Sequence, residues 1–496
     1  MSNSGSKSLL RQAGPLLIGR GGGAVLSFVL PLMLTRLLTV ADYGTYKAAF
    51  LIVSTAYFIL QAGLAQSLYY FVPRGGTERP AYLTQALATL MGFATFGALA
   101  MWLARWPLAH QFGNPALSDC ALPMALICLG MVVSAPLEIH LTAIGKVRHA
   151  ALTFFLSEAV RVGCSVVPLI IGWGLTGLLW ANAIHVGVRM LACVWLMRRE
   201  GGPTFSKGLL KEQLAYALPA GAAMLMAIPQ QTFHQWAVGG KVTTAEFAIY
   251  MVGCFQIPII NLLYAPISDV LQVRLAAPGG RTKALGLFHE ANLRLAAVFF
   301  PLCAGLCAVG SLFIPALFTH RYDESVPIFR LAVMTIPFAA LPLDAMLRSL
   351  GQTKYIFRNS AVKLGLTIPG VLIGMKFFGM VGAIAAHAGV EAILRTAMLF
   401  RVRREVHCTA AALLPWGHLA HLGLASLLGC LPVLVICRLP AAQARPFPWL
   451  LISGGAYALV YAAALALGPG KGSPVVRLKR ALLGNAEPPV ELKRAA

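Results

Sequence analysis

The sequence predicts an all-α polytopic membrane protein with about 14 transmembrane helices. Of its 496 residues, 58% are hydrophobic and only 11% are charged, whereas a soluble domain carries roughly 25% charged residues. Apolar stretches of about 20 residues recur along the whole chain. The sequence also resembles itself at a spacing of about 205 residues. Together these features predict two six-helix lobes related by a parallel pseudo-two-fold axis, followed by two C-terminal helices.

Each predicted span is an apolar segment long enough to cross the hydrocarbon core of a bilayer. The segments lie near residues 14–37, 44–72, 81–104, 120–141, 151–172, 175–197, 213–238, 246–272, 284–317, 325–346, 356–375, 379–400, 416–437 and 448–467.

The charge distribution predicts how these spans are oriented. The chain has 40 Lys and Arg against 17 Asp and Glu, a formal net charge of +23. With the N-terminus in the cytosol, the inner loops and the two termini hold about 25 of these cations and the outer loops about 8, which agrees with the positive-inside rule. We therefore expect a multi-pass protein of a bacterial inner membrane with both termini in the cytosol. Topology accounts for the excess charge, so no nucleic-acid partner is expected.

The internal repeat is carried by short matched motifs. Its clearest matches are Pro136 with Pro342, Glu138 with Asp344, Gly145 with Gly351, Asp42 with Glu246, and the Arg-Arg-Glu at 198–200 with that at 403–405. The predicted domains are therefore an N-lobe at 1–200, a C-lobe at 201–405, two extra helices at 406–470 and a basic cytosolic tail at 471–496. Because each repeat has an even number of spans, both have the same orientation, with a central cleft expected between them.

Seven cations lie inside predicted spans, where a charge facing lipid is costly. They are Arg20, Arg161, Arg189, Arg294, Arg330, Lys363 and Arg395. Three have an acid three or four residues away: Arg161 with Glu158, Arg294 with Glu290, and Arg395 with Glu391. The others lack an acid at helical spacing. We expect Arg20 and Arg189, helped by Arg161 and Arg294, to bind a phosphate-bearing substrate. Arg20, which three glycines follow, could instead extend to the lipid headgroups.

Two other groups of polar residues are candidates for transport. Gln230, Gln231, His234 and Gln235 lie in one apolar segment, where they could bind sugar hydroxyls or bond neighbouring helices. The acids Glu138, Asp344 and Glu158 could form a gate or bind a coupling ion, either H⁺ or Na⁺; a plain capping role is the alternative for the repeated pair.

The motifs of an enzyme are missing from the sequence. The "GPGKGS" at 468–473 lacks the spacing of a phosphate-binding loop. His418 and His421 are three residues apart without a nearby third ligand, so we predict no metal site. No catalytic constellation lies on a loop. We therefore predict a transporter with no cofactor beyond a coupling ion.

One stretch resembles a known family. "LTRLLTVADYGTYKAAFLI" at 34–52 is similar to the first outer loop of Wzx-like polysaccharide-biosynthesis flippases, members of the multidrug/oligosaccharidyl-lipid/polysaccharide (MOP) exporter superfamily, which also contains the MATE antiporters. The matching positions are Leu34, Arg36, Leu38, Asp42, Tyr43, Gly44 and Tyr46. The number of spans and the two-lobe plan extend the resemblance over essentially the whole chain.

This resemblance implies a flippase that moves undecaprenyl-diphosphate-linked oligosaccharide across the inner membrane by alternating access, driven by an ion gradient. The implied partners are this polyprenyl-diphosphate-linked glycan, membrane lipids and polysaccharide polymerase or export proteins. The polyprenyl tail would leave through a lateral opening beside the last two spans. Alternatives within the superfamily are a lipid II-type flippase and a multidrug or cation antiporter. A membrane glycan polymerase or ligase is a further alternative, although the outer loops are short for such an enzyme.

Overall fold

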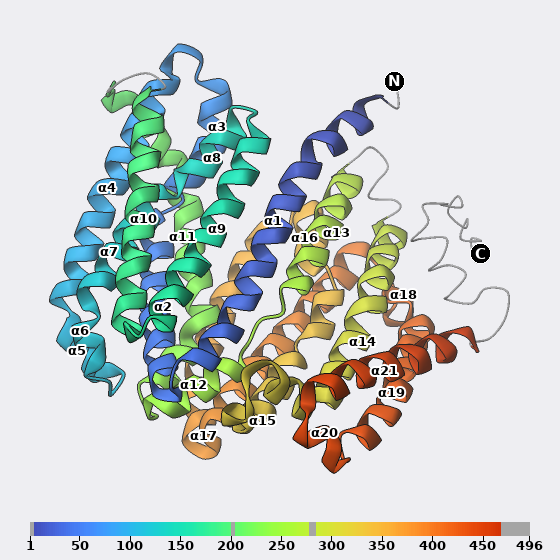
Figure 1. The fold of residues 1–496 in the computed structure, drawn as a ribbon. Helices are drawn as coiled ribbons and strands as arrows, with labels where there is room; N and C mark the ends of the chain where they lie inside the picture. Colours follow the sequence, from blue (N-terminus) through green and yellow to red (C-terminus); the bar gives the residue numbers. More distant parts are fainter. Residues whose placement is uncertain (1–3, 200–203, 277–283, 468–496) are drawn as a thin grey trace. The chain divides into compact units, whose positions relative to one another are not determined.

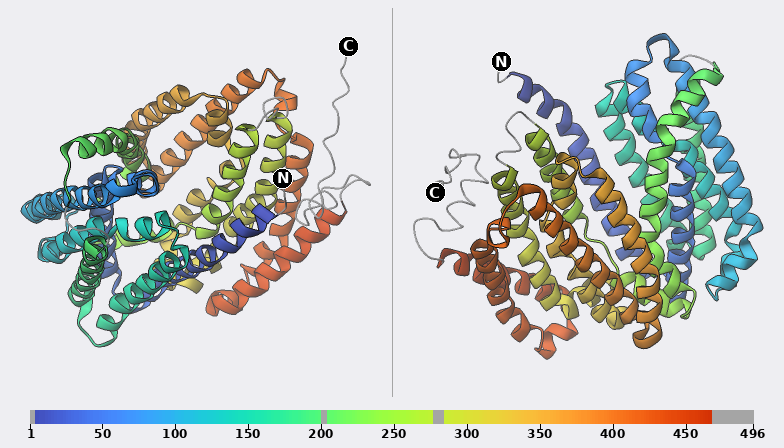
Figure 2. Two further views of the ribbon diagram at one scale, coloured as in Figure 1. Left: turned by 90° about the horizontal axis from the view of Figure 1, so that it is seen from above. Right: turned by 180° about the vertical axis from the view of Figure 1, so that it is seen from behind.

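The structure, a computed structural model, describes residues 4–199, 204–276 and 284–467, with side chains left out at 4–20 and at Ala220. Every regular element in this part of the chain is a helix (Figures 1 and 2). The predicted all-α class is therefore confirmed. The predicted tail at 471–496 lies outside the described residues.

The described chain forms two compact units, which join at Met251 and Val252 and are treated separately. Unit 1 contains the following elements: α1 (Ser4–Leu37), α2 (Val40–Gln61), α3 (Leu64–Arg74), η1 (Gly76–Glu78), α4 (Arg79–Leu103), α5 (Arg105–Gln111), α6 (Ala116–Asp119), α7 (Ala121–Ser134), α8 (Pro136–Ala143), α9 (Val147–Ile170), α10 (Gly174–Arg199), α11 (Lys207–Gly239) and most of α12 (Thr244–Gly253).

Unit 2 contains the remaining elements. They are α13 (Pro258–Ala276), α14 (Ala284–Phe318), η2 (His320–Ser325), α15 (Val326–Val333), η3 (Ile336–Ala340), α16 (Leu343–Ser349), α17 (Thr353–Val406), α18 (Ala410–Leu413), α19 (Trp416–Ile436), α20 (Pro440–Ala444) and α21 (Pro446–Ala466).

The boundary between the units differs from the predicted boundary of the repeats at 200 and 201. Helix α11 begins the second repeat in sequence, yet it packs against α2, α3 and α4 in unit 1. Compactness and sequence repetition therefore divide the chain at different places. The repeat-based domains stay a prediction.

Helices cover all fourteen predicted spans, but not every span is a separate long helix. Among the described residues, nine helices are long and apolar enough to cross a membrane, and counting the bent pairs α2–α3 and α12–α13 as one span each gives up to eleven. Helix α17, with 54 residues, covers two predicted spans and is counted once. These helices identify a multi-pass membrane protein. The number of fourteen spans stays a prediction.

Helix α17 is interrupted at Gly379, whose φ of 58° and ψ of −143° are not helical. A β-carbon on Gly382 would collide with the carbonyl oxygen of Gly374, so the backbones on the two sides of the break touch. The Tyr355 hydroxyl also donates to the Ala397 carbonyl at 3.2 Å. The two halves of α17 therefore form an antiparallel hairpin, as two successive spans require.

The same helix end occurs in both repeats. Gly145, after α8, and Gly351, after α16, have φ values of 80° and 76°, which glycine adopts without strain. The amide after each glycine donates to a carbonyl five residues back, 2.9 Å away at Lys146–Leu141 and at Gln352–Leu347. The matched glycines of the sequence are thus matched helix caps in the structure.

Candidate functional site

The glycines after Arg20 allow α1 to pack closely on α9. A β-carbon on Gly23 would lie 2.5 Å from the Phe154 ring, and one on Gly22 would lie 2.9 Å from the Phe155 ring. Nothing lies within 4 Å of the corresponding position on Gly21. The partner that approaches these glycines is therefore helix α9. The side chain of Arg20 itself lies outside the described residues.

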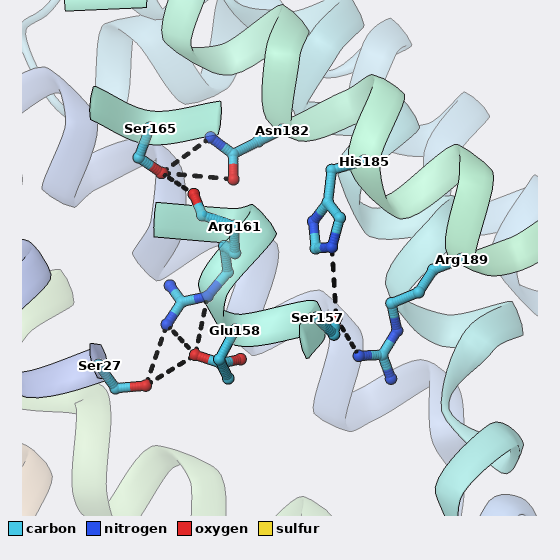
Figure 3. Close-up of polar contacts among 8 residues, drawn as sticks. All are labelled: Ser27, Ser157, Glu158, Arg161, Ser165, Asn182, His185 and Arg189. Carbon is cyan, nitrogen blue, oxygen red and sulfur yellow. Dashed lines mark hydrogen bonds and ion pairs between the residues drawn. The ribbon is translucent and has the colours of Figure 1, made fainter. Parts of the chain in front are cut away.

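This close packing completes a polar cluster between α1 and α9 (Figure 3). Arg161 donates through Nε to Glu158 Oε2 at 3.1 Å and through Nη2 to Ser27 Oγ at 3.1 Å. The Ser27 hydroxyl in turn donates to Glu158 Oε2 at 2.8 Å. The predicted pairing of Glu158 with Arg161 is confirmed. Both charges are neutralised locally, with a contact from α1 that the sequence did not reveal.

A second cluster in unit 1 joins α8, α9 and α10, and we call it the unit 1 quartet: Glu138, Ser157, His185 and Arg189. Arg189 Nη2 lies 2.8 Å from Glu138 Oε2. Arg189 Nη1 donates to Ser157 Oγ at 2.6 Å, and Ser157 Oγ lies 3.2 Å from His185 Nε2. Figure 3 shows Ser157 between the guanidinium and the imidazole. The quartet therefore links an ion pair to a histidine through one hydroxyl group.

Unit 2 has a cluster of its own, the unit 2 quartet: Asp344, Lys363, Glu391 and Arg395. Arg395 contacts both acids, with Nη1 3.2 Å from Asp344 Oδ2 and Nε 2.8 Å from Glu391 Oε1. Lys363 Nζ lies 2.6 Å from Glu391 Oε2. The predicted pairing of Glu391 with Arg395 is confirmed, and Lys363 and Asp344 extend it into an alternating chain of two acids and two bases.

The two quartets correspond position by position. Each member of the second lies 206 positions after its counterpart: 138 and 344, 157 and 363, 185 and 391, 189 and 395. In both units the ion pair joins residues 51 positions apart, from the short helix to the last helix of the repeat. The match of the Arg-Arg-Glu ends uses a spacing of 205, which places Arg189 opposite Leu394 instead. That single-residue difference is why the sequence did not reveal the correspondence.

A third charged group lines a small cavity between α13 and α14 in unit 2. Glu290 lies between two arginines, with Oε1 2.6 Å from Arg294 Nη2 and Oε2 3.2 Å from Arg274 Nη1. The predicted pair of Glu290 with Arg294 is confirmed, and Arg274 is an addition that the sequence did not single out. The cavity has a volume of about 170 Å³. This group carries one positive charge in excess.

A larger, almost wholly apolar groove of about 420 Å³ lies between α14, α19 and α21 in the same unit. Its walls include Pro301, Gly305, Val433, Tyr457 and Tyr461. Figure 1 shows α19 and α21, in red, beside α14, and the contacts between these helices agree. The last two long helices are therefore packed onto α14 within unit 2 and form a groove that suits a hydrocarbon chain.

The polar residues of α11 are only partly available to a ligand. His234 is buried and its Nδ1 lies 2.6 Å from the Tyr250 hydroxyl. Gln230 is buried and donates to the Met226 carbonyl at 3.0 Å. Gln231 is exposed, and Gln235 is half-buried. Bonding within the protein thus accounts for Gln230 and His234, the alternative that the sequence left open.

The motif that carries the family resemblance caps a helix. Thr39 Oγ1 accepts from the Asp42 amide at 3.1 Å and donates to Asp42 Oδ2 at 2.6 Å. Its repeat is a capping box in which Thr243 Oγ1 accepts from the Glu246 amide at 3.3 Å and the Thr243 amide donates to Glu246 Oε2 at 2.8 Å. A β-carbon on Gly44 would collide with the Thr244 carbonyl oxygen, so only glycine fits there.

Three of the cations that lack an acid at helical spacing have partners elsewhere in the structure. Arg189 and Lys363 have carboxylate partners on other helical segments, which helical spacing could not reveal. Arg330 donates through Nε to the Cys307 carbonyl at 2.9 Å. Burial explains all three, because a charge taken out of water requires a partner.

The predicted gate residues Glu138 and Asp344 are the acids that pair with Arg189 and Arg395. Four further members of these clusters have no sequence signal of their own: Ser27, Ser157, His185 and Arg274. Only the packing of helices brings them to the charged groups.

Comparison with solved structures identifies the fold. The lipid II flippase MurJ, in an inward closed conformation, is similar with a TM-score of 0.71 and 15% identity, covering 89% of this chain and 97% of that one. An inward-facing MATE multidrug transporter of the MOP superfamily has a TM-score of 0.60 and 14% identity, covering 78% and 94%. A mutant of the Vibrio cholerae MATE transporter VcmN has a TM-score of 0.55 and 15% identity, covering 82% and 98%. These neighbours are a flippase and transporters, not enzymes.

Sequence comparison assigns the family. No curated protein sequence matches the chain. Residues 33–327, more than half of the chain, match the family model described as "Polysaccharide biosynthesis protein". The matched region begins just before the Thr39–Asp42 helix cap and continues into unit 2, so it takes in the whole unit 1 quartet. The chain therefore belongs to the polysaccharide biosynthesis protein family, with the fold shared by MurJ and the MATE transporters.

Proposed function

We propose that the protein is a flippase that moves undecaprenyl-diphosphate-linked oligosaccharide from the inner to the outer leaflet of the bacterial inner membrane. The observation that carries this proposal is the apolar groove between α14, α19 and α21, in a chain of the polysaccharide biosynthesis family. A polyprenyl tail is a long hydrocarbon, and the groove offers it apolar walls. Both termini are in the cytosol, and the two repeats alternate access under an ion gradient.

The phosphates of the substrate are bound at the cluster between α13 and α14, which has surplus positive charge. Glu158 neutralises Arg161 and Glu138 neutralises Arg189, whereas Glu290 alone faces both Arg274 and Arg294. Arg294 Nε is buried without a hydrogen-bond partner among the described residues, so it can still donate. Guanidinium groups bind phosphate oxygens through paired hydrogen bonds. The main phosphate contact is therefore assigned to Arg294 and Arg274 in place of Arg189, while Arg20 stays a candidate.

A multidrug antiporter is the weaker alternative. The MATE neighbours cover about four-fifths of this chain with TM-scores of 0.60 and below, against 0.71 and 89% for the lipid II flippase. A cation exporter would also need acids in excess at its binding site, whereas bases are in excess around Glu290.

The test uses a strain that lacks the protein. We expect lipid-diphosphate-linked glycan to accumulate on the inner leaflet, as measured by lipid extraction, mass spectrometry and accessibility to an enzyme added outside. Wild-type protein should restore export. The double variant Arg274→Gln/Arg294→Gln should lower export at least about tenfold at equal membrane abundance, because each lost charged hydrogen bond to phosphate weakens binding by about 1.5 to 3 kcal/mol.

Arg321→Gln is the matched control, because Arg321 is an exposed arginine of η2 outside the cavity. It should export like wild type. Full export by the double variant would show that the phosphates bind elsewhere. Absence of any accumulated glycan in the deletion strain would contradict the flippase function itself.

A further inference from the structure

The two quartets share their geometry but differ in the groups that can change charge. In the unit 2 quartet, Asp344 and Glu391 face Lys363 and Arg395, so two negative charges balance two positive ones. No buried side-chain nitrogen or oxygen of these four lacks a hydrogen bond within the described residues. Proton uptake or loss at any member would leave an opposite charge uncompensated. The four members therefore hold a fixed charge, and the titratable group beside them is His387, which interacts with Lys363 and Glu391.

In the unit 1 quartet, two of the four positions have different chemistry. Ser157 is found where unit 2 has Lys363, and His185 is found where unit 2 has Glu391. With a neutral imidazole, Glu138 and Arg189 balance each other. Histidine is the side chain whose ordinary titration falls near neutral pH. Among the eight members of the two quartets, His185 is therefore the one with such a side chain.

The hydrogen bonds of this quartet leave two buried atoms without a partner. A guanidinium group only donates, so Ser157 Oγ accepts from Arg189 Nη1. The Ser157 proton is then available to His185 Nε2, which leaves the imidazole proton on Nδ1. His185 Nδ1 and Glu138 Oε1 are both buried and have no hydrogen-bond partner among the described residues. A ring N–H donor and a carboxylate acceptor thus both have unused capacity in one cluster.

The helices packed against α10 bring few other charges to His185. Helix α9 contributes Glu158 and Arg161, which already neutralise each other. Helix α7 contributes the thiol of Cys128 and no charged residue. Helix α4 has no charged residue after Arg79, at its start.

On α10 itself, the charged neighbour of His185 is Arg189, which belongs to the quartet. From α2, Tyr57 interacts electrostatically with Glu138 and Arg189. Glu158 acts on His185 directly, whereas Glu138 acts through Arg189: it neutralises the guanidinium that is hydrogen-bonded, by way of Ser157, to the imidazole.

We propose that His185 and Glu138 form a proton-binding site in unit 1, in which His185 takes up the coupling proton, while the unit 2 quartet is its permanently charged counterpart. The role of this site in coupling rests on the proposed transport function, whereas proton binding at His185 does not depend on it. When His185 is protonated, both ring nitrogens become donors, so Nε2 donates to Ser157 and the Ser157 proton must reorient. Proton binding would thereby change the contact between α9 and α10.

The binding itself can be measured without transport. Deuterium exchange at the imidazole Cε1–H, followed site by site with mass spectrometry, reports the titration of each histidine in the purified full-length protein. We expect the rate at His185 to change with pH with a midpoint between about pH 5 and 8. Glu138→Gln should move that midpoint downward by about one pH unit, because it leaves the positive charge of Arg189 near His185 without its carboxylate partner. His421, on α19, is the internal control and should not shift.

A rate at His185 that stays flat between about pH 5 and 9 would overturn the proposal, as would a midpoint that Glu138→Gln leaves in place. The wild-type titration requires no variant to fold. In cells, His185→Gln should lower glycan export at least about tenfold at equal abundance, whereas His421→Gln should not. Titration at His185 without glycan accumulation in the deletion strain would sink the flippase function and keep the proton site. Glycan export without titration would do the reverse.

Discussion

The unit 1 and unit 2 quartets occupy corresponding positions in the two repeats, yet one contains a serine and a histidine where the other contains a lysine and a glutamate. In both, an acid on the short helix binds an arginine on the last helix of the repeat. The ion pair is therefore common to both repeats, and the two positions around it differ. The ion pair is the structural constant, and its neighbours determine whether the cluster has a fixed or a variable charge.

The largest expected difference between the quartets follows from removing the shared arginine. Arg395→Leu leaves Asp344 and Glu391 with only Lys363, so it should lower the free energy of unfolding by about 3 to 5 kcal/mol. Arg189→Leu leaves the single carboxylate Glu138, which can neutralise itself by taking up a proton, so the loss should be about 1 to 3 kcal/mol. Chemical unfolding in bilayer nanodiscs at neutral pH measures both. Equal losses would contradict the distinction between a fixed and a variable cluster.

A second prediction concerns the contact that only unit 1 has beside its quartet. The positions corresponding to Glu158 and Arg161 are Leu364 and Thr367, so unit 2 has no second ion pair there. Gly23→Ala places a methyl group against Phe154 and should destabilise the protein by about 1 to 3 kcal/mol. Thermal unfolding in the same nanodiscs measures the loss.

Gly21→Ala is the control for this substitution, because its β-carbon meets nothing within 4 Å. It should leave the midpoint of thermal unfolding unchanged or raise it slightly, since alanine favours a helix over glycine. If Gly23→Ala is as stable as Gly21→Ala, then close packing of α1 on α9 does not hold Ser27 at Glu158.

The smallest expected effects are at the two copies of the helix cap. Thr39→Ala and Thr243→Ala each remove a hydroxyl that accepts from a backbone amide, at a cost of about 1 kcal/mol. Both variants also lose a hydroxyl bond to the acid, 2.6 Å at Asp42 and 2.8 Å at Glu246. Thr243→Ala should cost no more than Thr39→Ala, because the bond from the backbone amide of residue 243 to Glu246 does not depend on the hydroxyl. Thermal unfolding of the two variants in parallel measures the difference; a clearly larger loss for Thr243→Ala would contradict it.

The fold could be predicted largely from the sequence, because apolar segment length and the repeat depend on local composition. Helices occur at every predicted span, and matched glycines such as Gly145 and Gly351 cap matched helices. Pairs within one helix, such as Glu158 with Arg161, could also be predicted from spacing.

Contacts between helices could not be predicted in this way. Arg189 pairs with Glu138, which lies 51 positions earlier in the sequence. Lys363 pairs with Glu391, on the other half of the α17 hairpin. Helical spacing says nothing about either distance, so spacing alone leaves both bases without a partner. A lone histidine in an apolar segment, such as His185, has no sequence signal of its own. It becomes a candidate only when the two repeats are aligned and position 185 is seen to correspond to Glu391.

The packing of α11 onto α2, α3 and α4 has a consequence for how the chain could be divided. The helix that opens the second sequence repeat belongs to the compact unit that otherwise contains the first repeat. A cut between the repeats would therefore separate α11 from the helices on which it packs. Two co-expressed fragments should reassemble better when the chain is cut after Met251 than when it is cut at the boundary of the repeats.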